Sequence, residues 1–198
     1  MSFGIAITIN ANLGISPVSS LPFVIGVILG VSTGTVLTIV MWVFILLQII
    51  ILRSQYKLLN LTQFFASVLL GTFVDVSLFI LGGFSLPTYL GQFAMLVVSI
   101  PICALGIYLF LRAKLAPLPL EGFILAIIQV KPKFKFHIVK ITADCTIVCM
   151  GIILSFIFLN ELVGIREGTI LSAIFIGKSI PYVKRIVDPF LRKISFPE

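Results

Sequence analysis

The sequence predicts an all-α polytopic membrane protein, and composition and apolar run length are the two observations that predict it. Of its 198 residues, 60% are hydrophobic and only 11% are charged, with a mean hydropathy of +1.24. Soluble domains carry about 25% charged residues, so this chain lacks the polar residues that a water-facing surface needs. Because backbone polar groups in hydrocarbon must be paired within their own segment, the apolar runs are expected to be helices.

The apolar runs provide about six transmembrane helices in a single domain that covers residues 1–198. Five runs have about the 20 residues that a helix needs to cross a bilayer; they lie at about 34–52, 61–81, 88–111, 138–159 and 168–187. The first run, 1–9, reaches only about 14 Å of a hydrocarbon core about 30 Å thick. This run is either a truncated first helix, with the rest of it upstream of Met1, or a half-span; the internal repeat described below favours truncation.

The positive charges gather in alternate loops. They follow the runs at 34–52, 88–111 and 168–187, whereas the loops between hold only Arg166. By the positive-inside rule, the basic loops and both termini are cytoplasmic, with 188–198 as a short basic interfacial tail. The net charge of +7 is thus a topology signal, and we expect the lipid bilayer and no nucleic acid as a partner.

An internal repeat divides the chain into two halves, at about 1–83 and 88–187. Residues 4–17 align with 106–119 without a gap, and residues 65–71 align with 171–177 at nearly the same spacing. Two matches in the same order indicate homologous halves. Since each half has three spans, the second half enters the membrane upside down. This arrangement is an inverted-topology repeat, as in many secondary transporters.

Each half also contains a short apolar segment, at 21–29 and 120–130, that is preceded by prolines. Apolar segments of this length are typical of re-entrant or interfacial helices, and the sequence leaves both interpretations open. If both are re-entrant, they enter from opposite faces and direct free backbone N–H groups toward the midplane. Such helix N-termini favour an anionic group there.

Two motifs carry a resemblance to a known family. The chain has Asn-Leu-Gly-Ile-Ser-Pro at 12–17, after Gly-Ile-Ala at 4–6, and Arg-Glu-Gly-Thr-Ile at 166–170. In these motifs the chain resembles the YczE/YitT-type bacterial membrane proteins over nearly its whole length. The resemblance implies several spans in the bacterial cytoplasmic (inner) membrane and a longer apolar segment before Gly4. It implies no substrate or reaction. The motif residues Asn12 and Ser16 are candidate solute-pathway residues.

Ionisable residues within the spans are further candidates, because each is costly in hydrocarbon unless it is paired. Lys140 and Asp144 are spaced i,i+4 and can pair on one helix face, although Lys140 can also serve as an interfacial anchor. Asp75 and Lys178 each follow the repeated glycine of their half. We expect the inverted halves to bring these two together, either as a structural lock or as a proton- or ion-coupled gate.

Three charged residues flank the membrane segments. Glu121 opens the second short segment and Glu167 opens the last span, where each carboxylate can cap a helix N-terminus. Arg166 is the basic residue on the outer side, and it is expected to bind an acidic partner such as Glu161 or a substrate anion.

These features favour a secondary transporter or permease for a small, anionic solute or an ion. The alternative is a non-transporting membrane subunit or accessory protein, which includes a substrate-binding subunit of an ATP-driven importer; a homo-oligomer or a partner subunit fits either. We expect no enzyme, catalytic residue, cofactor or metal site. His137 has no nucleophile or metal-ligand pattern around it, and Cys103, Cys145 and Cys149 fit apolar filling of the spans.

Overall fold

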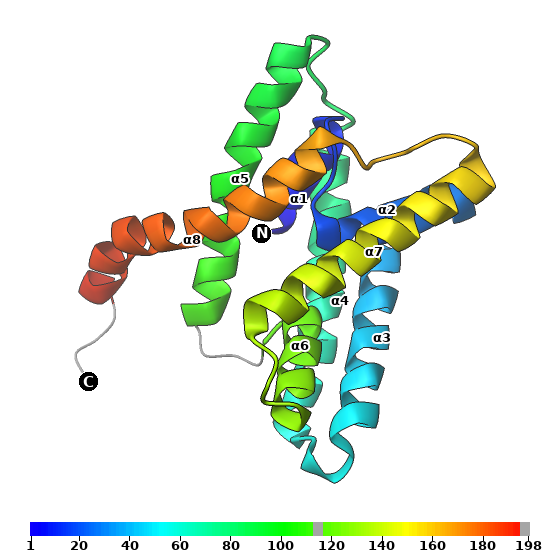
Figure 1. Cartoon of the computed structure of the whole chain (residues 1–198). Coiled ribbons are helices and arrows are strands. Elements are labelled where there is room, and N and C mark those ends of the chain that lie inside the picture. The colour runs from blue at the N-terminus through cyan, green and yellow to red at the C-terminus, as the bar shows by residue number, and fades with distance from the viewer. Residues whose placement is uncertain (113–116, 195–198) are drawn as a thin grey trace.

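The computed structural model describes residues 1–112 and 117–194, and all regular structure in these ranges is helical (Figure 1). The two 3₁₀ turns, η1 (Arg53–Gln55) and η2 (Leu58–Leu61), join the third and fourth helices. The helices are α1 (Ser2–Asn10), α2 (Pro17–Leu29), α3 (Thr33–Leu52), α4 (Thr62–Leu81), α5 (Tyr89–Arg112), α6 (Pro119–Val130), α7 (Phe136–Leu159) and α8 (Glu167–Ile194).

Four of these helices, α3, α4, α5 and α7, are long and apolar enough to cross a membrane. They match four of the predicted spans. The segment predicted as the last span does form a helix, α8, but it carries Lys178, Lys184, Arg185 and Asp188 and lies outside this group. The helix α8 continues through Pro189 to Ile194, into the predicted basic tail. Six apolar spans are therefore not shown.

The short helices have sequence-encoded starts and ends. Pro17 and Pro119 occupy the first turns of α2 and α6, where their missing N–H groups cost no hydrogen bond. Gly30 ends α2 in a left-handed conformation, with φ of 65°. With 13 and 12 residues, α2 and α6 are too short to span a bilayer. The sequence prediction of two short apolar segments is confirmed, and α1, with 9 residues, is short as predicted.

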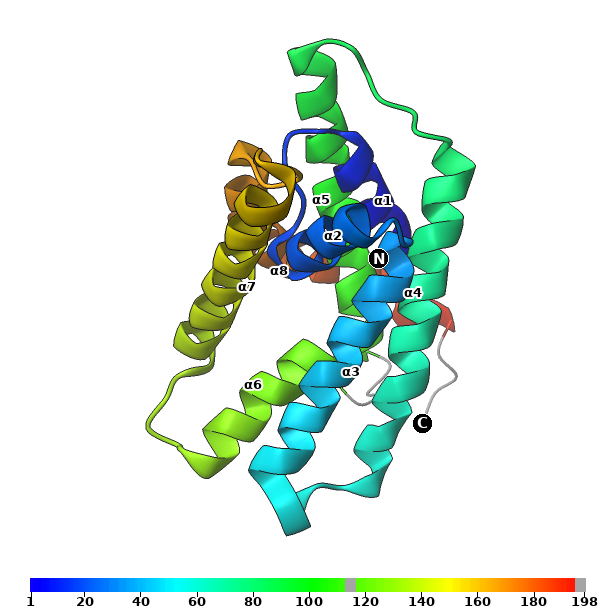
Figure 2. The same cartoon turned by 90° about the vertical axis from the view of Figure 1, so that its right-hand side faces the viewer.

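The helices pack around two apolar clusters (Figures 1 and 2). In the first cluster α1 lies against α4 and α5, with Ile5, Ile9, Leu37, Val74 and Cys103 in the core. The second cluster joins α2, α6 and α7 through buried residues on each, namely Leu21, Leu120, Ile124 and Ile147. The further packed pairs include α3 with α4, α5 with α8, α3 with α6, α2 with α3, and α2 with α8.

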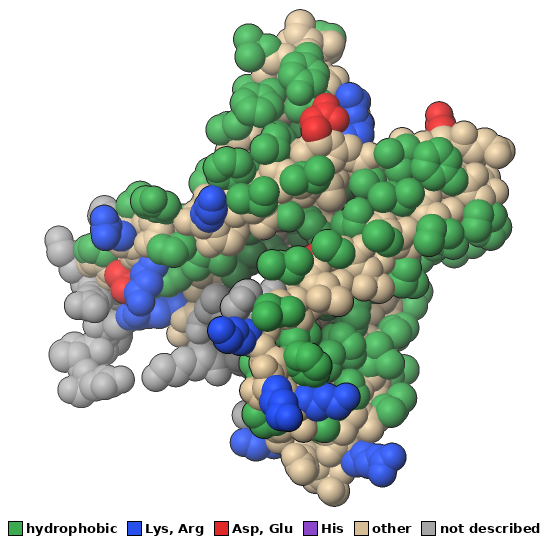
Figure 3. Space-filling view, in the orientation of Figure 1, with side chains coloured by type: hydrophobic (Ala, Val, Ile, Leu, Met, Phe, Trp, Pro, Cys, Tyr) green, Lys and Arg blue, Asp and Glu red, His purple; other side chains and the backbone are tan. Residues whose placement is uncertain are grey.

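Hydrophobic side chains cover much of the face of the molecule that Figure 3 shows. Phe79 is 88% exposed, Leu90 77% and Phe65 75%. Isolated exposed apolar residues are ordinary on a soluble protein, but a continuous apolar surface marks contact with lipid or with another protein. Together with the four long apolar helices, this surface fits a membrane location.

Candidate functional site

The two sequence motifs meet in space, although they lie about 150 residues apart in the chain. The backbone N–H of Ile15 donates to the carbonyl of Gly164 at 2.9 Å, and that of Gly168 donates to the carbonyl of Leu13 at 2.6 Å. The loop before α2 is thereby joined to the loop between α7 and α8. We call these residues, 12–16 and 164–169, the loop junction.

Glycines make the loop junction possible. Gly14 has φ of 118°, which a residue with a side chain rarely adopts, and a Cβ there would lie 2.7 Å from the backbone nitrogen of Thr169. A Cβ on Gly168 would lie 2.5 Å from the carbonyl oxygen of Leu13. The motif glycines therefore allow two backbones to approach each other.

The polar motif residues complete the loop junction. The Arg166 guanidinium donates to the carbonyl of Asn12 at 3.0 Å and lies 3.4 Å from the Glu167 carboxylate. Arg166 thus pairs with Glu167, and the expectation of Glu161 as its partner is wrong because Glu167 is the nearer carboxylate. Ser16 shares a hydrogen bond of 2.8 Å with Ser19. Since these contacts connect chain segments to each other, the loop junction is foremost a structural element.

Asp75 binds the start of α3. Its carboxylate accepts hydrogen bonds from the Ser32 hydroxyl at 2.6 Å and from the Gly34 backbone N–H at 2.7 Å. A carboxylate at a helix N-terminus satisfies free N–H groups and stabilises the helix dipole. Asp75 also borders a cavity of about 410 Å³ with the turn between α2 and α3.

The predicted pair of Asp75 and Lys178 is therefore wrong. The free N–H groups of α3 supply the partner of Asp75, whereas Lys178 is exposed on α8 and has no acidic partner in residues 1–112 and 117–194.

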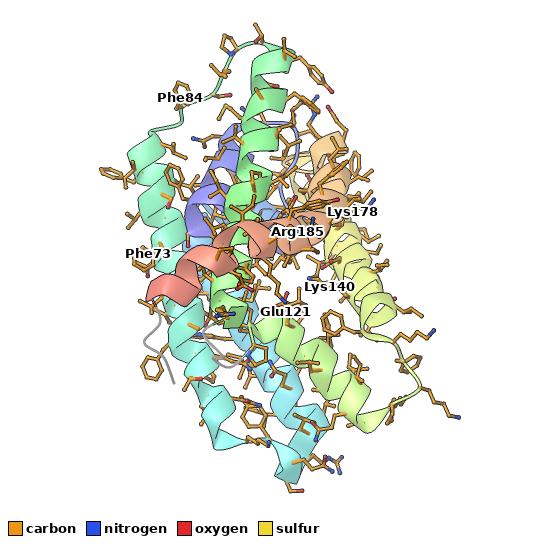
Figure 4. All side chains as sticks on the ribbon, turned by 90° about the vertical axis from the view of Figure 1, so that its left-hand side faces the viewer. Phe73, Phe84, Glu121, Lys140, Lys178 and Arg185 are labelled. Carbon is orange, nitrogen blue, oxygen red and sulfur yellow. The ribbon has the colours of Figure 1, made fainter. Side chains whose placement is uncertain are left out.

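Glu121, Lys140 and Asp144 form an ion-pair cluster, of which Figure 4 labels Glu121 and Lys140. The Lys140 ammonium lies 3.1 Å from an Asp144 oxygen and 3.5 Å from a Glu121 oxygen. The i,i+4 pair predicted in α7 is confirmed. Glu121 lies in the first turn of α6, as predicted, but it forms an ion pair with Lys140 in place of a side-chain cap. The ion-pair cluster thus links α6 to α7.

Two properties make the ion-pair cluster the best candidate for a solute or ion site. Its side chains are only 20–31% exposed, and two carboxylates share one ammonium, so the charges sum to −1. Figure 4 also places Glu121 and Lys140 on the side of α6 and α7 that faces α8. An unbalanced charge in a partly buried position favours binding of a cation or a proton.

A buried amide pair was not foreseen. Gln48 donates from its Nε2 to Gln63 Oε1 at 3.0 Å and to the Pro119 carbonyl at 2.9 Å, and both glutamines are 1% exposed. Gly122 allows α6 to lie against this pair, because a Cβ there would be 2.6 Å from Gln48 Oε1. The signal in the sequence is a glutamine in each of two mainly apolar helices.

The remaining candidate groups are not assembled. In the part of the chain that the structure describes, no three His, Cys, Asp or Glu side chains lie close enough to hold a metal ion. Cys103 is buried, Cys145 and Cys149 are exposed, and all three are free thiols. The side chains of His137, and of Arg192 and Lys193 in the basic tail, are not among those that the structure describes.

The ion-pair cluster makes a testable contribution to stability. Replacing Lys140 with methionine leaves two carboxylates facing each other, and breaking a fully buried pair costs about 3–5 kcal/mol. Because this cluster is partly exposed, we expect a loss of about 1–2 kcal/mol in the free energy of unfolding. Unfolding by SDS in mixed micelles measures it.

Lys178→Met is the matched control, because Lys178 is exposed and should change stability little. Adding Glu121→Gln and Asp144→Asn to Lys140→Met should restore most of the loss. A Lys140→Met protein as stable as the Lys178→Met protein would contradict the pairing.

The described part of the chain is all-helical, and its four long apolar helices and exposed apolar side chains fit the class of helical membrane proteins. Within this class the chain belongs to the Family of unknown function (DUF6198), which matches residues 1–185. Neither the curated proteins nor the solved structures include a match. The resemblance to the YczE/YitT-type proteins stays a prediction.

Proposed function

We propose that the protein is a secondary transporter or permease that moves a small solute across the bacterial cytoplasmic membrane. In this proposal its two halves are inverted repeats that exchange conformations. The observation that carries the proposal is a difference between two hairpins: α3 and α4 pack tightly, whereas α7 and α8 diverge (Figures 1 and 2).

The helix packing supports the repeat. In the proposed repeat, each helix of the first half corresponds to one of the second half: α1 to α5, α2 to α6, α3 to α7 and α4 to α8. Under this correspondence the contact of α2 with α7 is equivalent to that of α6 with α3. Likewise, the contact of α1 with α4 is equivalent to that of α5 with α8, and the contact of α2 with α3 to that of α6 with α7. All of these pairs are in contact. Such correspondence is expected of halves related by a pseudo-two-fold axis.

Matched glycines lie where α1 crosses α5. A Cβ on Gly4 would lie 2.5 Å from the Cys103 sulfur of α5, and a Cβ on Gly106 would collide with Met1 at the start of α1. Gly4 and Gly106 are aligned in the sequence repeat. Each glycine therefore allows its own helix to lie close to the helix of the other half. This is the relation expected of two residues that a pseudo-two-fold axis exchanges.

The hairpins break this correspondence. Between α3 and α4, a Cβ on Gly71 would collide with the carbonyl of Gly34, and the Trp42 indole donates to the Ser67 hydroxyl at 3.1 Å. The repeat counterpart of Gly71 is Gly177, and a Cβ there would meet no atom within 4 Å. One hairpin is closed and the other is open, which is the asymmetry that alternating access requires of inverted repeats.

The open hairpin leaves Glu121 and Lys140 of the ion-pair cluster facing α8 (Figure 4). The cluster's charge of −1, with Lys140 between Glu121 and Asp144, is suited to a coupling proton, a coupling cation or a cationic group of the solute. The sequence expectation of an anionic solute came from the N-termini of the short helices. Because the first turn of α6 contains Glu121, the cluster favours positive charge there.

Distances between spin labels test the exchange. In a background without native cysteines, labels at Val31 and Phe79 report on the closed hairpin, and labels at Ile138 and Tyr182 report on the open one. All four side chains are exposed. In liposomes we expect two populations for each pair, in which the α7–α8 distance shortens as the α3–α4 distance lengthens. The measurement is pulsed electron paramagnetic resonance over a range of pH.

A variant and a control sharpen this test. Gly177→Trp fills the open face of α8 and should abolish the population with the shorter α7–α8 distance, whereas tryptophan at the exposed Ile174 should not. Labels at Phe3 and Phe93, on α1 and α5, should keep one distance. A single unchanging distance in both hairpins under all conditions would refute alternating access and leave the accessory-subunit hypothesis.

A further inference from the structure

We propose that the basic half of α8, residues 178–189, binds the headgroups of anionic phospholipids. This proposal does not depend on the transport proposal, because the site lies where α8 meets the C-terminal end of α5. The observations behind it are the distribution of side chains around α8, a cavity beside the basic residues and the contacts that hold Asp188.

The helix α8 has three faces, which differ in the kind of side chain that they present. One face packs against α5 and includes the partly or fully buried Ser172, Ile176, Val183 and Val187. A second face is apolar and exposed: Phe175, Tyr182 and Ile186 are 46%, 68% and 65% exposed, and their spacing of seven and four residues places them on one side of the helix. The third face is basic, with exposed Lys178, Lys184 and Arg185.

This arrangement is typical of a helix at the boundary between lipid and water. Interfacial helices place aromatic and aliphatic residues in the acyl region and lysine or arginine at the headgroups. The apolar content of α8 is too low for it to be counted with the four spans. Tyr182 fits the boundary particularly well, because tyrosine has an apolar ring and a polar hydroxyl.

A cavity gives the basic face a defined shape. It has a volume of about 530 Å³ and is lined by Pro181, Lys184, Arg185, Asp188 and Pro189. Lys184 and Arg185 have no acidic partner within 4.0 Å in the part of the chain that is described. Their charges are therefore available to a phosphate group at the edge of the bilayer.

The negative charge of Asp188 does not neutralise the basic residues of this cavity, because Asp188 also binds side chains of α5. The Tyr108 hydroxyl and the Arg112 guanidinium, which lies 3.1 Å from Asp188, both contact its carboxylate. With Arg112, Lys184 and Arg185 counted against Asp188, the cluster carries a net charge of +2. Positive pockets on membrane helices attract anionic lipids, at about 1 kcal/mol for each basic residue near the surface. The occupant that fits is thus a phospholipid with a negative headgroup.

Native mass spectrometry of the full chain with phosphatidylglycerol and phosphatidylcholine tests the site. Wild-type protein should retain phosphatidylglycerol selectively. Lys184→Gln with Arg185→Gln should lower this selectivity about thirtyfold, as expected for two basic residues. Lys131→Gln with Lys133→Gln removes the same charge from an exposed loop and should change it less than about twofold.

Two additional measurements separate the occupants. Lys184→Arg with Arg185→Lys keeps both charges and should keep the selectivity. Millimolar inorganic phosphate should leave lipid binding unchanged, because the acyl chains on the apolar face contribute to it. Equal selectivity in wild-type and Gln-substituted protein, or complete displacement by inorganic phosphate, would overturn the lipid site.

Discussion

Replacing Gly71 with alanine is expected to lower the free energy of unfolding by about 2–3 kcal/mol. The added Cβ would collide with the Thr38 hydroxyl and with the carbonyl of Gly34. The carbonyl belongs to the backbone of a neighbouring helix, so the clash is relieved only if α3 and α4 separate. Reversible unfolding by SDS in mixed micelles measures the loss, and spin labels on α3 and α4 measure the separation.

Gly177→Ala is the control for this substitution, because Gly177 is the repeat counterpart of Gly71 and lies in open space. Alanine in a helix is more favourable than glycine by about 0.5–1 kcal/mol, so this variant should be slightly more stable than wild type. Opposite signs for the two substitutions would support the unequal hairpins. Equal effects would mean that both glycines have the same surroundings, contrary to the structure.

Replacing Gly14 with alanine is expected to cost about 3–4 kcal/mol, which is the sum of backbone strain and a steric clash. Gly14 has φ of 118°, and the new Cβ would lie 2.7 Å from the backbone nitrogen of Thr169. The loop junction should open as a result. Hydrogen exchange at the Gly168 amide, which donates to Leu13, should then become faster together with the loss of stability.

Gly83→Ala separates strain from clash. Gly83 also has a positive φ, of 75°, but a Cβ there would meet nothing within 4 Å. Only the cost of the left-handed conformation remains, about 1–2 kcal/mol, and exchange at Gly168 should be unchanged. If Gly14→Ala costs no more than Gly83→Ala, the close approach at the loop junction is wrong.

Local sequence features predicted most helices and one ion pair. The apolar runs located α3, α4, α5 and α7, since a membrane span is specified by its own composition. Lys140 and Asp144 were paired correctly because the i,i+4 spacing fixes their proximity within one helix. The two motifs at 12–17 and 166–170 were singled out, but their contact across the fold could not be read from either one.

The failures concern contacts between helices. Asp75 was matched with Lys178 because each follows the repeated glycine of its half, but Ser32 and the Gly34 amide at the start of α3 provided the donors that it binds. The sequence predicted a capping role for Glu121 and missed its ion pair with Lys140. That ion pair depends on how α6 packs on α7. Hydropathy also led us to predict a transmembrane span at 168–187. The structure has an amphipathic helix with basic residues there, which is not among the four apolar spans.

The bond between Asp75 and the start of α3 has a consequence for biogenesis. Until Asp75 is present, the Gly34 amide has no acceptor from α4, and an unpaired amide in lipid costs several kcal/mol. The ribosome adds Asp75 about 40 residues after Gly34. We therefore expect the translocon to release the third and fourth helices into the bilayer together, as a preassembled pair.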